Sequence, residues 1–345
     1  MGYNRIATPR AYVDLINYTL AHGWSAASNI TVLQDDGSTA VTFNAGTKES
    51  MFDLRPANFA QIDDATQAFY IHYNTEFSTD SLAESNFIAI LGHNFHDADA
   101  VFKVQTDDAS DMASPTTVTT TGNHTKVINA AADSTADYID PATNGWTLIT
   151  WSTQTSNNQH VRITIEDDDG TSSNFAEDVQ IGAILYGEYV DFPSSPDLSI
   201  QTSVDYDNTK LQHSIGGNTY ANTASFGQPK WAANTPWDNQ TTSSGETYSF
   251  DHRYGRTSHK MNFSYITDTD LFPENSHKTM FTPTGLHSQF YNKILGQHNP
   301  FLFTIDKDSI IEGDYGLFRL ADSGLNATQV AHRTWSMGLN IVETW

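Results

Sequence analysis

The sequence predicts a mainly β protein made of two antiparallel β-sandwich domains, each with about one helix. Three observations favour this fold class. Short apolar runs alternate with polar turns along most of the chain. Asp far outnumbers Glu, and Asp is a residue of turns and helix caps. Only two segments carry apolar residues at helical spacing.

The strand-like runs fall into two groups on either side of a linker. Two prolines and two serines in residues 192–197 follow a long apolar run and predict a domain boundary. We therefore expect a first domain at 1–193 and a second at 194–345. The expected strands lie at 29–33, 39–43, 68–73, 87–91, 101–104, 146–151, 160–165 and 179–190, and then at 198–200, 248–250, 259–266, 300–306, 316–320 and 333–345.

One helix is predicted in each domain. Thr8 suits the N-cap of the first, Pro9 its first helical position, and Gly23 follows its end. The second helix is expected at Pro283–Gln297, before Pro300. Each prediction rests on apolar residues that recur at helical spacing. They are Tyr12, Leu15, Ile16 and Leu20 in the first helix and Leu286, Phe290, Ile294 and Leu295 in the second.

The charge of the chain limits its partners. Asp and Glu number 41 against 17 Lys and Arg, so the formal net charge is −24. A chain this acidic repels nucleic acid and anionic membrane surfaces. No apolar run approaches the ~20 residues of a membrane-spanning helix, so no membrane insertion is expected. The chain has no cysteine, which excludes disulfides, thiolate metal sites and a cysteine nucleophile.

One acidic turn, Glu166-Asp167-Asp168-Asp169-Gly170, suggests calcium. It does not fit the EF-hand loop, because placing Gly170 at the sixth position puts Ile165 at the first, where a ligand is needed. Asp167 and Asp169 stay as weak candidates for Ca²⁺ in another geometry. The alternative is a hairpin turn with exposed carboxylates. No other cofactor is expected.

Catalytic patterns are missing from the sequence. It contains no G-x-S-x-G elbow, P-loop, H-E-x-x-H or G-x-G-x-x-G. The many carboxylates cluster in turns, and spacing alone places no pair of them for glycoside hydrolysis. Two histidines in Gly92-His93-Asn94-Phe95-His96 could meet a metal only if that segment turns tightly. We therefore expect a protein that is not an enzyme.

Four segments together resemble the tail and baseplate structural proteins of tailed bacteriophages. They are the Gly92-His93-Asn94 strand end, the Ile181-Gly182 to Gly187 strand, the stretch at 253–264, and the 300–345 block with its Pro-Phe-Leu-Phe and terminal Trp-to-Glu strands. The resemblance implies a galactose-binding-like β-sandwich for residues 1–193 and a tail-protein-like sandwich for 194–345. It also implies that His93 and Asn94 bind backbone at a sharp corner and not a ligand.

The function implied by this resemblance is structural. It predicts a virion component made in the host cytoplasm, in the tail, baseplate or fibre-attachment region. Its expected partners are copies of itself in a symmetric ring and other virion tail proteins. The only dense basic stretch contains Arg253, Arg256 and Lys260, which we expect at an assembly contact. The alternative for that stretch is a solvated loop.

Two rival functions belong to other classes. The first is a carbohydrate-binding module or adhesin, in which a surface glycan would contact the loop aromatics Trp231, Trp237 or Trp24. The second is a polysaccharide-degrading tail enzyme. Glycan binding by the isolated chain would favour the first rival, release of reducing ends the second, and symmetric rings the virion component.

Overall fold

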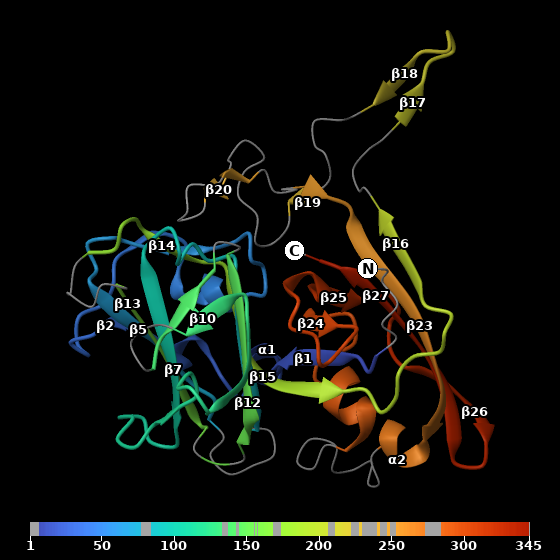
Figure 1. Ribbon diagram of the computed structural model, residues 1–345, viewed down its shortest axis with the longest axis horizontal. Coiled ribbons are helices and arrows are strands. Elements are labelled where there is room, and N and C mark those ends of the chain that lie inside the picture. Colours follow the sequence, from blue (N-terminus) through green and yellow to red (C-terminus); the bar gives the residue numbers. More distant parts are fainter. Residues whose placement is uncertain are drawn as a thin grey trace.

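The computed structural model describes residues 7–76, 84–132, 137–142, 145–154, 156, 158–167, 174–205, 211–221, 228–229, 240–241, 247–248, 253–272 and 284–344. In these residues the protein is mainly β, with large antiparallel sheets, which confirms the predicted fold class (Figure 1). None of the helices in this part of the chain has the length and apolar character needed to cross a membrane.

One eleven-stranded antiparallel sheet runs through both halves of the chain. Its order is β16-β23-β27-β25-β24-β1-β15-β6-β12-β9, and β26 pairs with β27 beside this path. The strands in that order are β16 (Gln201–Asp205), β23 (Arg256–Thr267), β27 (Thr334–Glu343), β25 (Tyr315–Leu320), β24 (Phe301–Thr304), β1 (Arg10–Asp14), β15 (Ala183–Asp191), β6 (Ser85–Leu91), β12 (Trp146–Gln154) and β9 (His124–Ile128), with β26 at Asn326–Ala331.

A second, seven-stranded sheet faces part of the first and completes the sandwich of the N-terminal half. Its order is β10-β11-β7-β13-β5-β2, with β8 paired to β7. The strands are β10 (Ala130–Ala132), β11 (Ile139–Pro141), β7 (Ala100–Asp107), β13 (His160–Asp167), β5 (Ala68–Asn74), β2 (Ile30–Gln34) and β8 (Thr116–Thr117). A three-stranded sheet of β14 (Val179–Ile181), β4 (Ala60–Ile62) and β3 (Phe43–Ala45) lies beside them.

The remaining elements are short. Three two-stranded ladders join β17 (Leu211–His213) to β18 (Thr219–Ala221), β19 (Gln228–Pro229) to β22 (Arg253–Tyr254), and β20 (Gln240–Thr241) to β21 (Thr247–Tyr248). The β17–β18 hairpin stands away from the rest of the protein (Figure 1). Helical segments are α1 (Leu15–Ala21), η1 (Ala27–Asn29), η2 (Lys48–Phe52), α2 (Asp268–Leu271), the π-helical η5 (His287–Tyr291) and η6 (Glu312–Asp314).

The start of the first predicted helix is wrong. Residues from Arg10 to Asp14 form strand β1, and α1 begins only at Leu15. Asp14 is the N-cap, because its carboxylate accepts hydrogen bonds from the backbone N–H groups of Ile16 and Asn17. The segment before it pairs with β15 on one side and β24 on the other, so sheet pairing overrides helical spacing. Gly23 follows the helix with φ +70°, as predicted.

The second predicted helix is shorter than expected. Pro283 lies outside the described residues, and the regular part is the π-helical stretch His287–Tyr291. Leu286, Phe290 and Ile294 are buried in the core, as their spacing predicts. Leu295 instead has φ +54° and packs against Leu15 and Tyr18. The change to positive φ ends the helical face one residue early.

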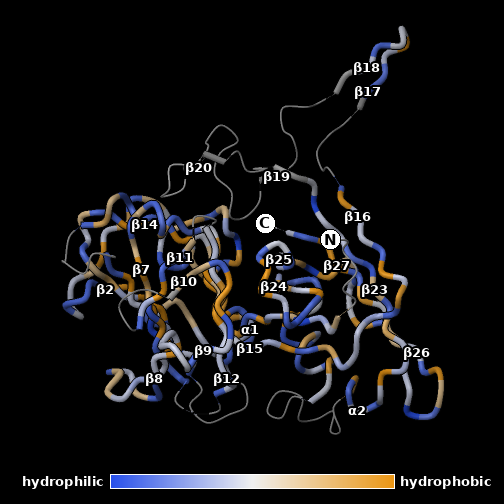
Figure 2. The backbone as a smooth tube through the Cα atoms, in the orientation of Figure 1, coloured by the Kyte–Doolittle hydropathy of each residue, from blue (hydrophilic) through white to orange (hydrophobic). Residues whose placement is uncertain are grey.

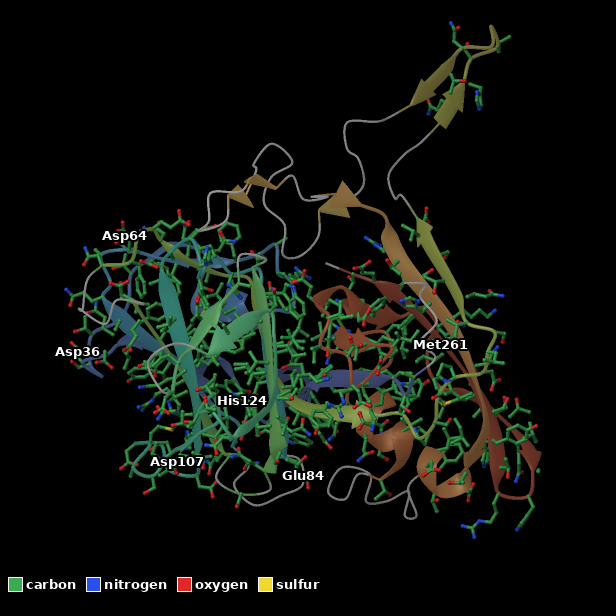
Figure 3. All side chains as sticks on the ribbon, viewed as in Figure 1. Asp36, Asp64, Glu84, Asp107, His124 and Met261 are labelled. Atoms are coloured by element: carbon green, nitrogen blue, oxygen red, sulfur yellow. The ribbon has the colours of Figure 1, made fainter. Side chains whose placement is uncertain are left out.

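Most buried apolar side chains of the described residues form three large clusters. The first fills the sandwich, where Phe69, Phe102 and Ile163 of the second sheet meet Ile88 and Ile149 of the first. Another lies in the C-terminal half, where the helical residues around Phe290 cover the sheet beside Met261 (Figure 3). Hydrophobic residues concentrate on the strands that meet in these clusters, and the loops around them are largely hydrophilic (Figure 2).

The third cluster joins the two halves. It contains Phe87 and Trp146 from the N-terminal half and Leu302, Tyr315 and Leu317 from the C-terminal half. Strand β1 lies between the halves and is buried on both faces: Tyr12 enters this shared cluster, and Ala11 and Val13 enter the C-terminal cluster. The division at residue 193 stays a prediction, and the large sheet continues across it.

Polar groups also link the halves. Lys293, which follows η5, forms a buried ion pair with Glu188 of β15, with 2.5 Å between Nζ and Oε2. Lys126 of β9 donates from Nζ to the backbone oxygens of Lys307 (2.6 Å) and Ser309 (2.9 Å). Lys293 and Glu188 are buried and Lys126 is half-buried, and each contact joins segments that are far apart in the sequence. These charged hydrogen bonds therefore help to hold the halves together.

Candidate functional site

A pocket of about 420 Å³ opens on the C-terminal half. One wall is the helical segment from His287 to Gly296, and the opposite wall is the 323–327 segment that leads into β26. The pocket is lined by Phe272, His287, Tyr291, Asn292, Gly296, Ser323, Gly324, Leu325 and Ala327. It therefore combines aromatic rings with an amide and a hydroxyl.

The π-helical turn positions two of the lining side chains. Asn292 donates its backbone N–H to the carbonyl of His287 (2.9 Å), which closes the wide turn. Such turns are rare and often occur at functional sites. Among the described residues the pocket has three rings, those of His287, Tyr291 and Phe272. The centroid of the Phe272 ring lies 6.1 Å from that of His287 and 5.1 Å from that of Trp335, which it meets edge-on. Trp335 is itself held by a 2.8 Å hydrogen bond from Nε1 to Asp268. Trp335 and Asp268 thus hold the Phe272 ring in place.

Two polar atoms at this pocket are buried without a hydrogen-bond partner among the described residues: the hydroxyl of Tyr291 and Nδ1 of His287. Tyr291 is only 6% exposed. Burial, together with the nearby charge of Asp322, raises the pKa of the Tyr291 hydroxyl, so the group stays protonated and able to donate. An unsatisfied buried polar group costs ~1–3 kcal/mol. A ligand hydroxyl that reached either atom, after a side-chain rotation that uncovers it, would remove that cost.

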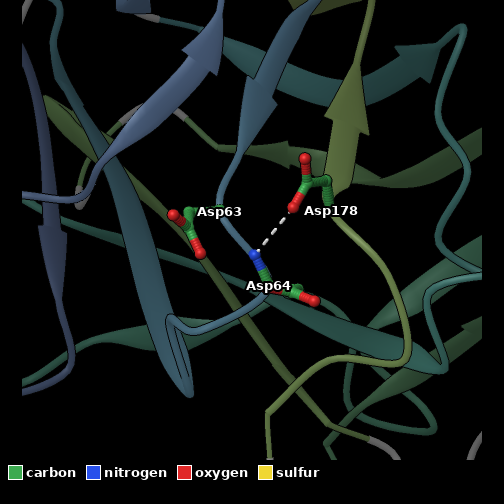
Figure 4. Close-up of side chains that lie close together, drawn as sticks. All are labelled: Asp63, Asp64 and Asp178. Carbon is green, nitrogen blue, oxygen red and sulfur yellow. Dashed lines mark hydrogen bonds between the residues drawn. The ribbon is translucent and has the colours of Figure 1, made fainter.

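A second cluster lies on the N-terminal half and consists of carboxylates (Figure 4). Ligand oxygens of Asp63, Asp64 and Asp178 all lie within 4.8 Å of one another. Asp178 accepts hydrogen bonds from the Asp64 backbone N–H (3.0 Å) and from the Asn44 amide (2.9 Å). Oxygen ligands of this kind suit a hard cation such as Ca²⁺. The same hydrogen bonds also tie the two loops together, so the cluster has a structural role without an ion.

The predicted calcium residues lie elsewhere. Asp167 ends β13, is 6% exposed and pairs in register with Ala100 of β7. Among the described residues it belongs to no group of three metal-ligating side chains. Asp169 lies outside the described residues, so its role stays a prediction.

The predicted assembly residues lie near one edge of the large sheet. Arg256 and Lys260 are both on β23, where they stand opposite Asp205 and Gln201 of the edge strand β16. Lys260 is exposed and Arg256 is half-buried. The backbone of Arg253 belongs to β22. At Arg256 and Lys260 the stretch is therefore strand, and the solvated-loop alternative does not hold there.

Of the three predicted glycan-contact residues, the structure describes only Trp24. Trp231 and Trp237 lie outside the described residues. Trp24 is half-buried and stacks on His22, with ring centroids 4.6 Å apart, and it meets Tyr18 edge-on at 6.0 Å. This tryptophan packs within its own loop next to α1.

The predicted corner at His93 and Asn94 is confirmed. His93 is buried, and its Nδ1 accepts the backbone N–H of Phe95 at 3.4 Å. Burial lowers the pKa of His93 to about 3, so the ring stays neutral. Asn94 accepts the backbone N–H of Gln180 (2.7 Å) and donates to the carbonyl of Asp178 (2.9 Å). Gly92 turns the chain with φ +66°, where a Cβ would lie 2.9 Å from the Pro56 carbonyl oxygen.

Sequence reasoning missed the pocket. Its walls come from segments that are far apart in the sequence. The spacing of residues along the chain cannot show that Phe272 and Leu325 line the same pocket. One signal was available. His287 and Tyr291 each lie one position after the apolar stripe of the helical segment, which places them at its flank, where His287 is half-buried and Tyr291 is at the border of the core.

No protein-family profile matches this sequence, and no curated protein matches it. Similarity to solved structures is low. A chitosan-binding module from a Paenibacillus sp. IK-5 chitosanase/glucanase has a TM-score of 0.29 at 14% identity, over 46% of this chain and 93% of the module. A Ruminococcus gnavus GH29 fucosidase has a TM-score of 0.29 at 12% identity, over 48% and 26%. A Clostridium perfringens family 89 glycoside hydrolase has a TM-score of 0.24 at 12% identity, over 52% and 16%.

Proposed function

We propose that this chain is a carbohydrate-binding protein that holds a saccharide in the pocket between η5 and the 323–327 segment. The observation that carries this proposal is the pairing of aromatic surface with unsatisfied buried polar atoms. A sugar ring offers an apolar C–H face that packs on rings such as Phe272. Its hydroxyls can bond to the Tyr291 hydroxyl, the His287 imidazole and the Asn292 amide. Among the residues that the structure describes, the lining includes no carboxylate.

Removing one hydroxyl tests the proposal. Tyr291→Phe should weaken binding of the best saccharide about two- to tenfold, since a hydrogen bond contributes ~0.5–1.5 kcal/mol. It should leave the melting temperature unchanged or slightly higher, because the hydroxyl has no hydrogen-bond partner in the part of the chain that the structure describes. A glycan array on the intact chain would select the saccharide, and calorimetry would give the affinity.

The matched control is Tyr265→Phe, which removes a hydroxyl from a side chain that is 80% exposed on β23. This control should bind like the parent chain. An array without any bound glycan, or equal affinities for Tyr291→Phe and the parent, would rule the proposal out.

A second candidate function is the structural virion component that the sequence resemblance implies. It is favoured by the edge of the large sheet at β16, where all five residues are exposed. Leu198 and Val204, on or just before this strand, are 89% and 52% exposed. An uncovered strand edge invites pairing with another chain. A neighbouring copy in a ring or another tail protein would cover it. Mass spectrometry of purified virus particles would detect the chain directly.

Charge reversal tests the assembly contact. Lys260→Glu should weaken self-association at low salt, since it adds negative charge beside β16 in a chain of net charge −24. The melting temperature of the monomer should hardly change, because an exposed substitution usually shifts stability by less than ~0.5 kcal/mol. Mass photometry measures the association. Arg333→Glu, at an exposed site in the β26–β27 turn, is the control with the same charge change. Equal association of both variants would refute the contact at Lys260.

A further inference from the structure

Two histidines meet on the outer face of the second sheet of the sandwich. His72 is on β5 and His160 on the neighbouring β13. Phe69, Ile71 and Tyr73 of β5 point into the core, so His72 points away from it. Nε2 of His72 lies 3.0 Å from Nδ1 of His160, and the ring planes are 25° apart.

The register of the strands explains this contact. His72 stands opposite Arg162, and His160 stands opposite Asn74, so the two histidines are diagonal neighbours across an antiparallel pair. Each side chain therefore reaches the other without displacing the backbone. The positions are fixed by the ladder hydrogen bonds of three adjacent strands, because β13 also pairs with β7.

The distance between the two nitrogens suits a shared ion. Metal–imidazole bonds are ~2.0–2.1 Å long, so two such ligands at a right angle lie ~3.0 Å apart. We propose that His72 and His160 form a two-histidine site for a divalent transition metal ion of the Ni²⁺, Cu²⁺ and Zn²⁺ class. Imidazole suits all three ions, and affinity is expected to be highest for Cu²⁺. Water would fill the other coordination positions, since the described residues add no third ligand to this pair.

The surrounding charges favour a cation at one end of the pair. Glu76, Asp107 and Asp108 act on His160 as nearby negative charges, and Asp107 stands directly opposite it on β7. Arg162 is the opposing charge, with its guanidinium carbon 4.6 Å above the ring of Tyr70. On the other side of His72, β2 contributes the uncharged Thr31. The three carboxylates favour a cation at the His160 end of the pair, and the Arg162 guanidinium opposes it at the His72 end.

Calorimetry with NiCl₂ on the full chain, free of any histidine tag, tests the site. The parent chain should bind one Ni²⁺ more tightly than its other histidines do. His72→Gln and His160→Gln should each weaken this binding at least tenfold, because chelation by two nitrogens is lost. His332→Gln, an exposed histidine, is the control and should bind like the parent.

A second measurement needs no variant. One equivalent of CuCl₂ bound to the parent chain should give an electron paramagnetic resonance spectrum with splitting from two imidazole nitrogens. A spectrum with fewer nitrogens, or Ni²⁺ affinity equal in the parent and both variants, would overturn the proposal. In that case the 3.0 Å contact is an N–H···N hydrogen bond only.

Discussion

A chain that ends at Arg333 should be insoluble, because it lacks β27. This strand pairs with β23, β25 and β26, so its removal breaks three ladders at once. It also removes Met337, Leu339 and Ile341, each at most 2% exposed. At ~1.5–3 kcal/mol for each buried apolar side chain, the loss is roughly 5–9 kcal/mol before any ladder is counted. Whole domains are stable by only ~5–15 kcal/mol.

The soluble fraction after expression and a urea unfolding curve measure this effect. The volume-conserving substitution Met337→Leu is the control and should stay soluble, with a loss below ~1.5 kcal/mol. If the truncated chain is soluble and unfolds cooperatively, β27 is peripheral to the fold.

Lys293→Ala should lower the free energy of unfolding by ~3–5 kcal/mol, the usual cost of breaking a buried ion pair from one side. The side chains of Lys293 and Glu188 are only 2% and 8% exposed. Without the ammonium group, the carboxylate of Glu188 is left buried and unpaired. Glu84 lies nearby, and burial followed by the charge of Glu188 already raises its pKa (Figure 3). Lys293→Ala removes the cation whose charge offsets the carboxylates of Glu84 and Glu188.

Urea denaturation at pH 7 measures this loss, and a double variant separates its cause. Lys293→Met combined with Glu188→Leu removes both charges and keeps most of the volume, so it should recover much of the stability. A loss below ~1 kcal/mol in Lys293→Ala, or a double variant less stable than the single one, would contradict the prediction.

Much of the fold could be predicted because short-range patterns control it. Alternation in residues 68–73 and 160–165 marks β5 and β13, and Leu286, Phe290 and Ile294 mark the buried side of a helical segment. The corner at His93 could be predicted from its resemblance to other sequences. The strands and the helical segment depend on neighbours within a few residues, whereas the corner also needs the distant backbone of Asp178 and Gln180.

Other features depend on distant partners and could not be predicted. Tyr12 has helical spacing with Leu15 and Ile16, yet it lies in a strand because β15 and β24 offer it two ladders. The pocket requires Phe272 and Leu325 to meet across the fold. The contact between His72 and His160 depends on a strand register that no local pattern specifies. Tertiary pairing decides in all three cases.

The central place of β1 has a consequence for the order of events during synthesis. Arg10 reaches its first partner strand only across 181 residues, at Asp191, and its second at Thr304. The segment Ala11-Tyr12-Val13 is therefore synthesised long before both of its partner strands and acquires its full set of neighbours only after Thr304 is made. Such high contact order slows folding and leaves an apolar, strand-forming segment open to wrong partners meanwhile. A nascent chain stalled before residue 300 should thus recruit chaperones through residues 10–14, and synthesis past β24 should end that dependence.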